Sequence, residues 1–419
     1  MVSSSPTGPM RIILYGDLAS ERRASMDRYA RELGRALDVV RPDAAVELHT
    51  APDRRFGARA PFPVSKLANY YSRFVEYPRV AACDRADVFH VTDHAYAHLL
   101  FRLDPDRSVV TCHDLILLKL ANGEIPCRSR PRVATWMLRR SLRAMRRAAH
   151  VIADSESTKR DLVTLLRYPE SRISVVPLGV AERFRFMHEV TAIAGLRTRY
   201  GVPAGALPIL HVGSGAPYKN VEGVLHALAY VRACAGTACL LKVGCLTPAQ
   251  WALARRLDLE PAIRELGEVP EEDLPGVYAL AHCLLFPSFA EGFGLPPLES
   301  MACGLPVVVS RTAALAEVVG EAGLYVDADD PRGMAAAVLS LRDTTQAHVL
   351  RERGRARACL FTWSETARRT AEVYEAVAPA AGSETPSGHV SLLRRLDRPG
   401  AAPAAPLASG RAALARARL

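Results

Sequence analysis

The sequence lacks any apolar run close to the ~20 residues that a membrane-spanning helix needs. It also lacks a Cys-x-x-Cys pair, although it contains nine cysteines, and that odd number favours reduced thiols over a disulfide framework. Residues 1–9 are polar and lead directly into a predicted strand, so we expect no secretory signal. These absences favour a cytoplasmic protein, either soluble or held on the inner face of a membrane without crossing it.

The charge is strongly unbalanced, with a formal net charge of +10 over 419 residues. A basic chain favours anionic partners such as phosphates, nucleic acid or anionic lipid, although base usage in the genome could equally produce an arginine-rich composition. Nucleic acid is not expected, because the basic residues are not interleaved with aromatic stacking positions. The length exceeds one comfortable hydrophobic core and predicts two domains.

Short apolar runs alternate with helical patterns along most of the chain, which is typical of parallel α/β units. A first set of strands is predicted near residues 11–14, 88–91, 109–112, 151–153 and 174–176, and a second near 209–212, 240–243, 283–286, 307–309 and 323–326. We therefore predict two Rossmann-like domains, residues 1–188 and 189–377. From residue 378 the composition is rich in Ala, Pro and Arg, which predicts a disordered tail over 378–419.

The most informative stretch is residues 291–299, Glu-Gly-Phe-Gly-Leu-Pro-Pro-Leu-Glu, between two of the predicted buried strands. Pro296 and Pro297 mark a helix start, so the glycines before them offer backbone N–H groups and a helix N-terminus to an anion such as phosphate. Glu291 and Glu299 lie where they can bind hydroxyl groups near that anion. This combination indicates a nucleotide-sugar site.

The same stretch resembles the donor-site motif of the retaining glycosyltransferase family 4, which has the GT-B fold. Within that family the resemblance is to the mannosyltransferase-like group. Other family landmarks occur in the family's order over roughly residues 10–377: Asp87–His90, Thr111–Leu115, Val151–Glu156, Val175–Val180, His211–Gly213, Lys219–Asn220 and Trp363–Ser364. The resemblance implies two Rossmann-like domains facing a cleft. It also implies that the last helix, near 364–377, packs back on the N-terminal domain.

The resemblance implies transfer of a hexose from a nucleotide sugar, GDP-mannose or a UDP-sugar, to a glycan, lipid-linked or small-molecule acceptor. The nucleotide sugar is a co-substrate, and neither a metal nor another cofactor is expected. His113 and Glu291 are the implied catalytic residues. The implied donor-binding residues are Gly16, Gly213, Lys219, Val269, Glu291, Gly292, Phe293, Gly294, Leu295 and Glu299.

Two of these residues also have a rationale from their position alone. Lys219 follows a strand and two glycines, where a cation can neutralise a diphosphate, or it is merely a solvent-facing loop lysine. His113 directly follows a predicted strand, at the edge where open α/β sheets bind ligands, although a lone histidine is more often a satisfied core residue. The family usually has an arginine before the lysine and often one after the strand's glycine, but this chain has Tyr218 and Ser214 there.

Alternatives stay open from the sequence. A GT-B nucleotide-sugar epimerase would share the donor site, and a non-catalytic nucleotide-sugar-binding protein would keep only binding. The Asp327-x-Asp329 pair imitates a metal motif, but Asp330-Pro331 beside it is typical of a helix N-cap. Five arginines fall on one helical stripe, either a basic face for anionic lipid or a solvated surface: Arg128, Arg132, Arg139, Arg143 and Arg146.

Overall fold

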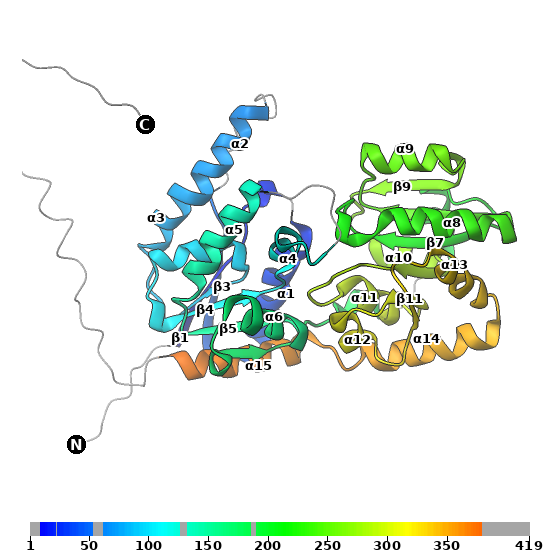
Figure 1. Ribbon diagram of the computed structural model, residues 1–419. Coiled ribbons are helices and arrows are strands. Elements are labelled where there is room, and N and C mark those ends of the chain that lie inside the picture. Colours follow the sequence, from blue (N-terminus) through cyan, green and yellow to red (C-terminus); the bar gives the residue numbers. More distant parts are fainter. Residues whose placement is uncertain (1–8, 22, 53–61, 126–131, 186–189, 379–419) are drawn as a thin grey trace, which may run out of the picture. The chain divides into compact units, whose positions relative to one another are not determined.

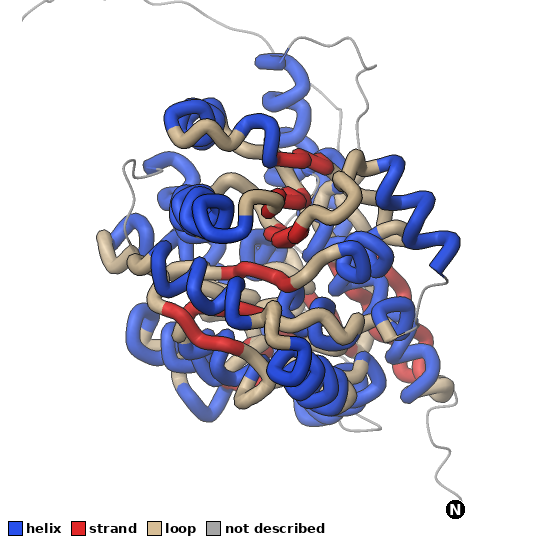
Figure 2. Tube along the Cα trace, turned by 90° about the vertical axis from the view of Figure 1, so that its right-hand side faces the viewer, coloured by secondary structure: helices blue, strands red, loops and turns tan. Residues whose placement is uncertain are grey.

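The computed structural model describes residues 9–21, 23–52, 62–125, 132–185 and 190–378. Two parallel sheets organise these residues, each with helices against its faces (Figures 1 and 2). The predicted α/β class is therefore confirmed. The predicted tail, from residue 379 on, lies outside the described residues.

The first sheet has the strand order β2-β1-β3-β4-β5-β6. Its strands are β1 (Met10–Tyr15), β2 (Ala44–His49), β3 (Val88–Val91), β4 (Ser108–Cys112), β5 (His150–Ala153) and β6 (Ile173–Val175). Its helices are α1 (Ala24–Val40), α2 (Phe62–Tyr71), α3 (Tyr77–Ala81), α4 (Ile116–Asn122), α5 (Arg132–Met145) and α6 (Glu156–Leu166). A π-helical turn, η2 (Ser72–Glu76), joins α2 to α3, and a 3₁₀ segment, η3 (His94–Phe101), follows β3.

The second sheet has the order β12-β11-β10-β7-β8-β9. Its strands are β7 (Leu207–Val212), β8 (Ala238–Val243), β9 (Ile263–Gly267), β10 (Cys283–Phe286), β11 (Val307–Ser310) and β12 (Leu324–Val326). The helices from here to the end of the described chain are α7 (Val190–Arg199), α8 (Val221–Ala235), α9 (Pro248–Arg256), α10 (Leu274–Leu280), α11 (Leu295–Ala302), α12 (Ala313–Val319), α13 (Pro331–Ser340), α14 (Thr344–Ala358) and α15 (Trp363–Val377).

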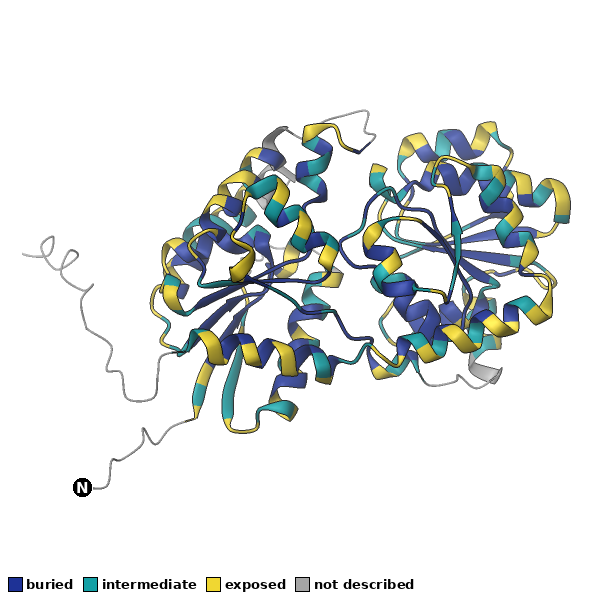
Figure 3. Cartoon of the chain, turned by 60° about the horizontal axis from the view of Figure 1, so that its bottom comes forward, coloured by how far each residue is buried: buried dark blue, intermediate teal, exposed yellow. Residues whose placement is uncertain are grey.

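Burial follows the pattern expected of parallel sheets covered on both faces. The central strands β3, β4, β10 and β11 are buried at every residue, whereas the covering helices expose one face (Figure 3). The short apolar runs that predicted these four strands therefore correspond to interior strands of the two sheets. Cys112 and Cys283 are buried within them, whereas Cys303, after α11, is partly buried.

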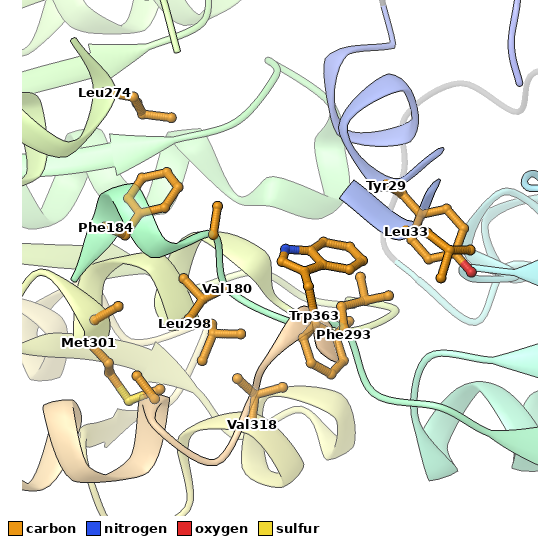
Figure 4. Packing of buried hydrophobic residues seen from close by; sticks show 14 of the residues in the cluster. Tyr29, Leu33, Val180, Phe184, Leu274, Phe293, Leu298, Met301, Val318 and Trp363 are labelled. Atoms are coloured by element: carbon orange, nitrogen blue, oxygen red, sulfur yellow. The ribbon is translucent and has the colours of Figure 1, made fainter. Parts of the chain in front are cut away.

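The last described helix, α15, packs against α1 and also touches β4 and β5. Its Tyr374 hydroxyl lies 2.6 Å from the Nδ1 atom of His90 in β3. At the start of the helix, Trp363 lies beside Phe293, and its ring centroid is 6.0 Å from that of Tyr29 (Figure 4). This aromatic contact joins the end of the chain to α1.

Candidate active site

The order of the second sheet reverses between β7 and β10, which are hydrogen-bonded neighbours although other strands separate them in the chain. The loops that leave such neighbours at their carboxyl ends run in opposite directions, and ligands of open α/β sheets bind in the resulting crevice. The loop after β7 carries Lys219, and the loop after β10 carries Glu291. The topology therefore brings together two residues that are 72 positions apart.

Lys219 and Glu291 form a bidentate ion pair. The Nζ atom of Lys219 lies 2.7 Å from Oε1 and 3.0 Å from Oε2 of Glu291, and both side chains are largely buried. The same ammonium lies 4.9 Å from the ring centroid of Phe286, the last residue of β10. The structure thus holds one cation and one carboxylate, facing each other, at the switch point of the sheet.

The glycine loop has the geometry that the sequence predicted. Gly294 adopts a φ of +114°, which favours glycine, and α11 begins at the next residue with prolines in its first turn. Phe293 points into the core and makes an edge contact with Phe361 at 5.9 Å between ring centroids. With Phe293 anchored, Gly292, Gly294 and Leu295 leave backbone N–H groups near the start of α11.

Gly292 makes a close approach to the first half of the chain. A Cβ atom added there would lie 2.0 Å from the carbonyl oxygen of His113 and 2.8 Å from Cβ of Asp114. The carbonyl oxygen of Gly292 accepts a hydrogen bond from the Ser155 hydroxyl at 2.6 Å and another from Thr158 at 3.3 Å. The glycine loop therefore packs against the residues that follow β4 and β5, and only glycine fits at position 292.

The loop after β7 has a support that the sequence did not reveal. Lys242 is buried in β8 and donates hydrogen bonds to the carbonyl oxygens of Gly213 and Val243. Burial lowers the pKa of Lys242 to about 8. Gly213 has a φ of +148° and its Cα faces the aliphatic stem of Lys219. The sequence does not predict that Lys242 supports this loop. Its neighbours form a buried apolar strand, and a single lysine in such a run carries no pattern that names its partners.

Glu299 is buried in α11, and each of its carboxylate oxygens has a partner. Tyr278 donates its hydroxyl to Oε2 at 2.7 Å, and Arg28 of α1 donates to Oε1. Burial raises the pKa of Glu299, and Arg28 opposes that rise. Glu299, one of the predicted donor-binding residues, is thus in contact with an arginine that the sequence did not single out.

A cavity of about 700 Å³ lies beside Arg28. Its lining includes two further residues that were predicted to bind the sugar donor, Gly16 and Val269. Arg28 and Arg31 line it from α1, and Glu271 lines it from the loop after β9. Arg31 donates to Glu271 at 2.7 Å. The cavity is large enough for a nucleotide-sized ligand, since small-molecule sites typically occupy about 300–1,000 Å³.

His113 follows β4 as predicted, and both of its ring nitrogens are engaged within the protein. Nδ1 lies 2.7 Å from the Asp154 carboxylate and Nε2 donates to the Thr92 carbonyl at 2.8 Å. Burial lowers the pKa of His113, but Asp154 outweighs it and the pKa rises to about 9. The residue is therefore an imidazolium at neutral pH. Its role toward the sugar stays a prediction, and the structure places it, buried, against the glycine loop.

The switch point of the first sheet, between β1 and β3, holds a cluster that sequence reasoning missed. Asp17 follows β1, Asp93 follows β3, and Arg23 donates to both carboxylates. The Oδ1 atom of Asp17 is buried and has no hydrogen-bond partner among the described residues. Burial, reinforced by Asp93, raises the pKa of Asp17 to about 8. Scattered single aspartates in loops gave no pattern that would have predicted this cluster.

Two aspartates act at the starts of helices. Asp330 caps α13 by accepting from Arg332 and Gly333, as expected of an N-cap, and Asp114 accepts from the backbone of Ile116. The described residues contain no group of His, Cys, Asp and Glu able to hold a metal ion. Nor does any described helix have the length and apolarity to span a bilayer.

The sequence matches two family profiles, one on each half of the chain. Residues 25–183 match the profile described as Glycosyltransferase Family 4, and residues 207–344 match Glycosyl transferases group 1. The O-antigen chain mannosyltransferase B of Escherichia coli is 32% identical over 280 residues, which cover 64% of this chain and 70% of that protein. The chain belongs to glycosyltransferase family 4.

Further relatives of this family 4 glycosyltransferase agree. A D-inositol 3-phosphate glycosyltransferase of Thermobispora bispora is 34% identical over 244 residues. These residues cover 54% of this chain and 56% of that protein. Among solved structures, sucrose-phosphate synthase from Thermosynechococcus elongatus superposes with a TM-score of 0.69 at 21% identity, covering 88% of this chain and 99% of that one. Anabaena HepE in complex with UDP and glucose gives 0.67 at 19% identity, with 88% and 100% covered. The fold is GT-B.

Proposed function

We propose that this glycosyltransferase moves a hexose from a nucleotide sugar, GDP-mannose or a UDP-sugar, to a hydroxyl of a glycan, lipid-linked or small-molecule acceptor, with retention of the anomeric configuration. The observation that carries the proposal is the Lys219–Glu291 pair at the sheet's switch point, beside the glycine loop. Two named relatives agree with the donor class: the Escherichia coli protein is a mannosyltransferase, and Anabaena HepE binds UDP and glucose.

We assign the following roles to these groups. The ammonium of Lys219 and the N–H groups before α11 stabilise the charge that develops on the departing diphosphate. Glu291 accepts hydrogen bonds from hydroxyl groups of the sugar as the anomeric carbon gains positive charge. Because Lys219 holds both oxygens of Glu291, that carboxylate is a poor covalent nucleophile. The acceptor oxygen therefore bonds to the anomeric carbon on the face from which the diphosphate leaves, as the bond between that carbon and the diphosphate oxygen breaks and the departing diphosphate takes up the acceptor's proton.

Product analysis tests this function. We expect wild-type protein, given GDP-mannose or a UDP-sugar in EDTA, to release the nucleoside diphosphate and to form a product whose NMR coupling shows the donor's anomeric configuration. We expect activity in EDTA because cationic side chains, rather than a metal ion, neutralise the charge on the diphosphate in the proposed reaction. An inverted product would contradict the mechanism. Consumption of the nucleotide sugar without release of diphosphate would indicate an epimerase.

Asp17 lines the same cavity as the predicted donor residues Gly16 and Val269, and its Oδ1 atom has no hydrogen-bond partner among the described residues, so we assign it to accept a hydroxyl of the bound substrates. Its pKa of about 8 lies above its ordinary value of 3.8, so its contribution to stability is present at low pH and is lost as pH rises through 8. We expect Asp17→Asn to raise the melting temperature at pH 8 by a few degrees, since it removes a buried carboxylate beside Asp93, and to lower transferase turnover about tenfold.

Differential scanning fluorimetry at pH 5 and pH 8, together with turnover, checks this prediction. Asp43→Asn, an exposed change on the surface, is the matched control. An Asp17 variant that is less stable at pH 8, or as active as wild type, would contradict the assignment.

A further inference from the structure

A second cavity, of about 600 Å³, lies wholly within the first half of the chain, and none of its residues belongs to the donor site. It is bordered by α2, η2, α3, η3 and α5, which Figure 1 places beside one another and which pack together, α5 on η3 and α3 on both η2 and η3. The lining residues are Tyr70, Phe74, Val75, Pro78, Arg79, His98, Phe101, Arg102, Trp136, Met137 and Arg140.

The walls of this cavity are apolar and partly aromatic. The rings of Phe74 and His98 pack at 4.7 Å between centroids, and Phe74 stacks on Tyr70. At the rim the side chains of Trp136 and Phe101 are 65% and 49% exposed. Large apolar side chains gathered at one opening mark an interaction site on a protein surface, because water does not favour their exposure.

The rim is also positively charged. Arg79, Arg102 and Arg140 are exposed and line the cavity, while no lining residue is an aspartate or glutamate. The guanidinium of Arg140 lies 6.0 Å from the ring centroid of Phe101. Burial lowers the pKa of His98 to about 4, so this histidine is neutral and the arginines alone set the charge. An apolar interior below a ring of guanidinium groups matches an amphiphile with an anionic head.

We propose that this cavity binds an anionic phospholipid of a bilayer, with the apolar chain region against Phe74 and Trp136 and the phosphate at the arginine rim. Tryptophan and arginine suit this depth, because each combines an apolar body with a polar end that stays at the headgroup level. Arginines at an anionic bilayer surface are attracted to its headgroups, so this rim favours reversible docking. Membrane contact would then lie at this cavity.

This location differs from the arginine stripe that the sequence suggested. Arg128 lies outside the described residues, while Arg139 and Arg143 are exposed on α5 without lining the cavity. Arg146 donates to the carbonyl of Arg167 at 3.2 Å. The stripe therefore supplies control residues on the same helix.

Co-sedimentation with vesicles tests the proposal. We expect wild-type protein to bind phosphatidylcholine vesicles that contain phosphatidylglycerol, to bind pure phosphatidylcholine vesicles at least fivefold less, and to be released by high salt. Arg102→Gln with Arg140→Gln should reduce binding at least fivefold. Phe101→Ser with Trp136→Ser should do the same without changing the net charge.

The matched control is Arg139→Gln with Arg143→Gln, which removes the same charge from α5 outside the cavity and should reduce binding less than twofold. Equal loss in control and lining variants, or no binding by wild type at low salt, would overturn the proposal. So would competition by inorganic phosphate alone, which would indicate a site for a soluble anion. Concentration-dependent dimers lost in the Phe101/Trp136 variant would assign the cavity to a second copy of the chain. Donor turnover in detergent-free buffer should stay unchanged in all variants, which separates this result from any failure of the proposed function.

Discussion

Lys219→Ala is expected to lower the rate of nucleoside diphosphate release from the sugar donor by about 10²–10³-fold, because a cation already in place beside a leaving group strongly stabilises the transition state. Weaker donor binding adds to the effect, since one lost charge-assisted contact corresponds to roughly 1.5–3 kcal/mol. The variant also leaves Glu291 buried without its cation.

Release of nucleoside diphosphate, followed with a coupled assay, checks this expectation. Lys159→Ala is the control, because Lys159 forms a comparable ion pair with Glu170 on the surface, at 3.0 Å. Adding Glu291→Gln to the Lys219 variant should recover stability without recovering turnover. A Lys219 variant within threefold of wild-type turnover would remove the residue from the site.

Gly292→Ala is expected to reduce turnover by at least about 100-fold, because the added methyl group would lie 2.0 Å from the His113 carbonyl and must displace the loop. A displacement of about 1 Å in a loop that positions the substrate commonly lowers turnover by about 100-fold. The fold should survive with a loss of about 1–3 kcal/mol, as for other overpacked sites. The hydrogen bond from Ser155 to the Gly292 carbonyl would be lost in the same movement.

Turnover and thermal unfolding measured side by side check this second expectation. Gly195→Ala is the matched control: Gly195 lies on the exposed face of α7 with nothing within 4 Å of an added Cβ. Alanine there should be neutral or slightly stabilising. Unchanged turnover in the Gly292 variant would show that the close approach to His113 is not needed for the reaction.

The sequence predicted the central strands well, because a strand covered on both faces is a short continuous apolar run. It missed β2 and β9, for the same physical reason. Both lie at a sheet edge, and their residues are mostly half-buried, so neither shows such a run. The glycine loop and the start of α11 were predictable, since Gly294, Pro296 and Pro297 each occupy a position that their backbone chemistry favours.

The site residues divide in a similar way. Lys219 and Glu291 could be predicted from motifs, but their ion pair depends on strand order, which the sequence does not show directly. The contact between Arg28 and Glu299 and the charge state of His113 depend on side chains that lie far apart in the chain. Helix periodicity places Arg28 on α1 and says nothing of its partner. Such long-range polar contacts need the fold before they can be inferred.

The proposed function requires residues at the second sheet's switch point to bind a nucleoside diphosphate. Isothermal titration calorimetry of the wild-type protein with GDP and with UDP, in EDTA, tests this binding without knowledge of the acceptor. We expect saturable one-site binding of at least one of these nucleotides, weakened about ten- to a hundredfold by Glu299→Gln and by Lys219→Ala. Two results would contradict this expectation: no binding of either nucleotide to well-folded wild-type protein, or wild-type affinity for the nucleotide in both variants.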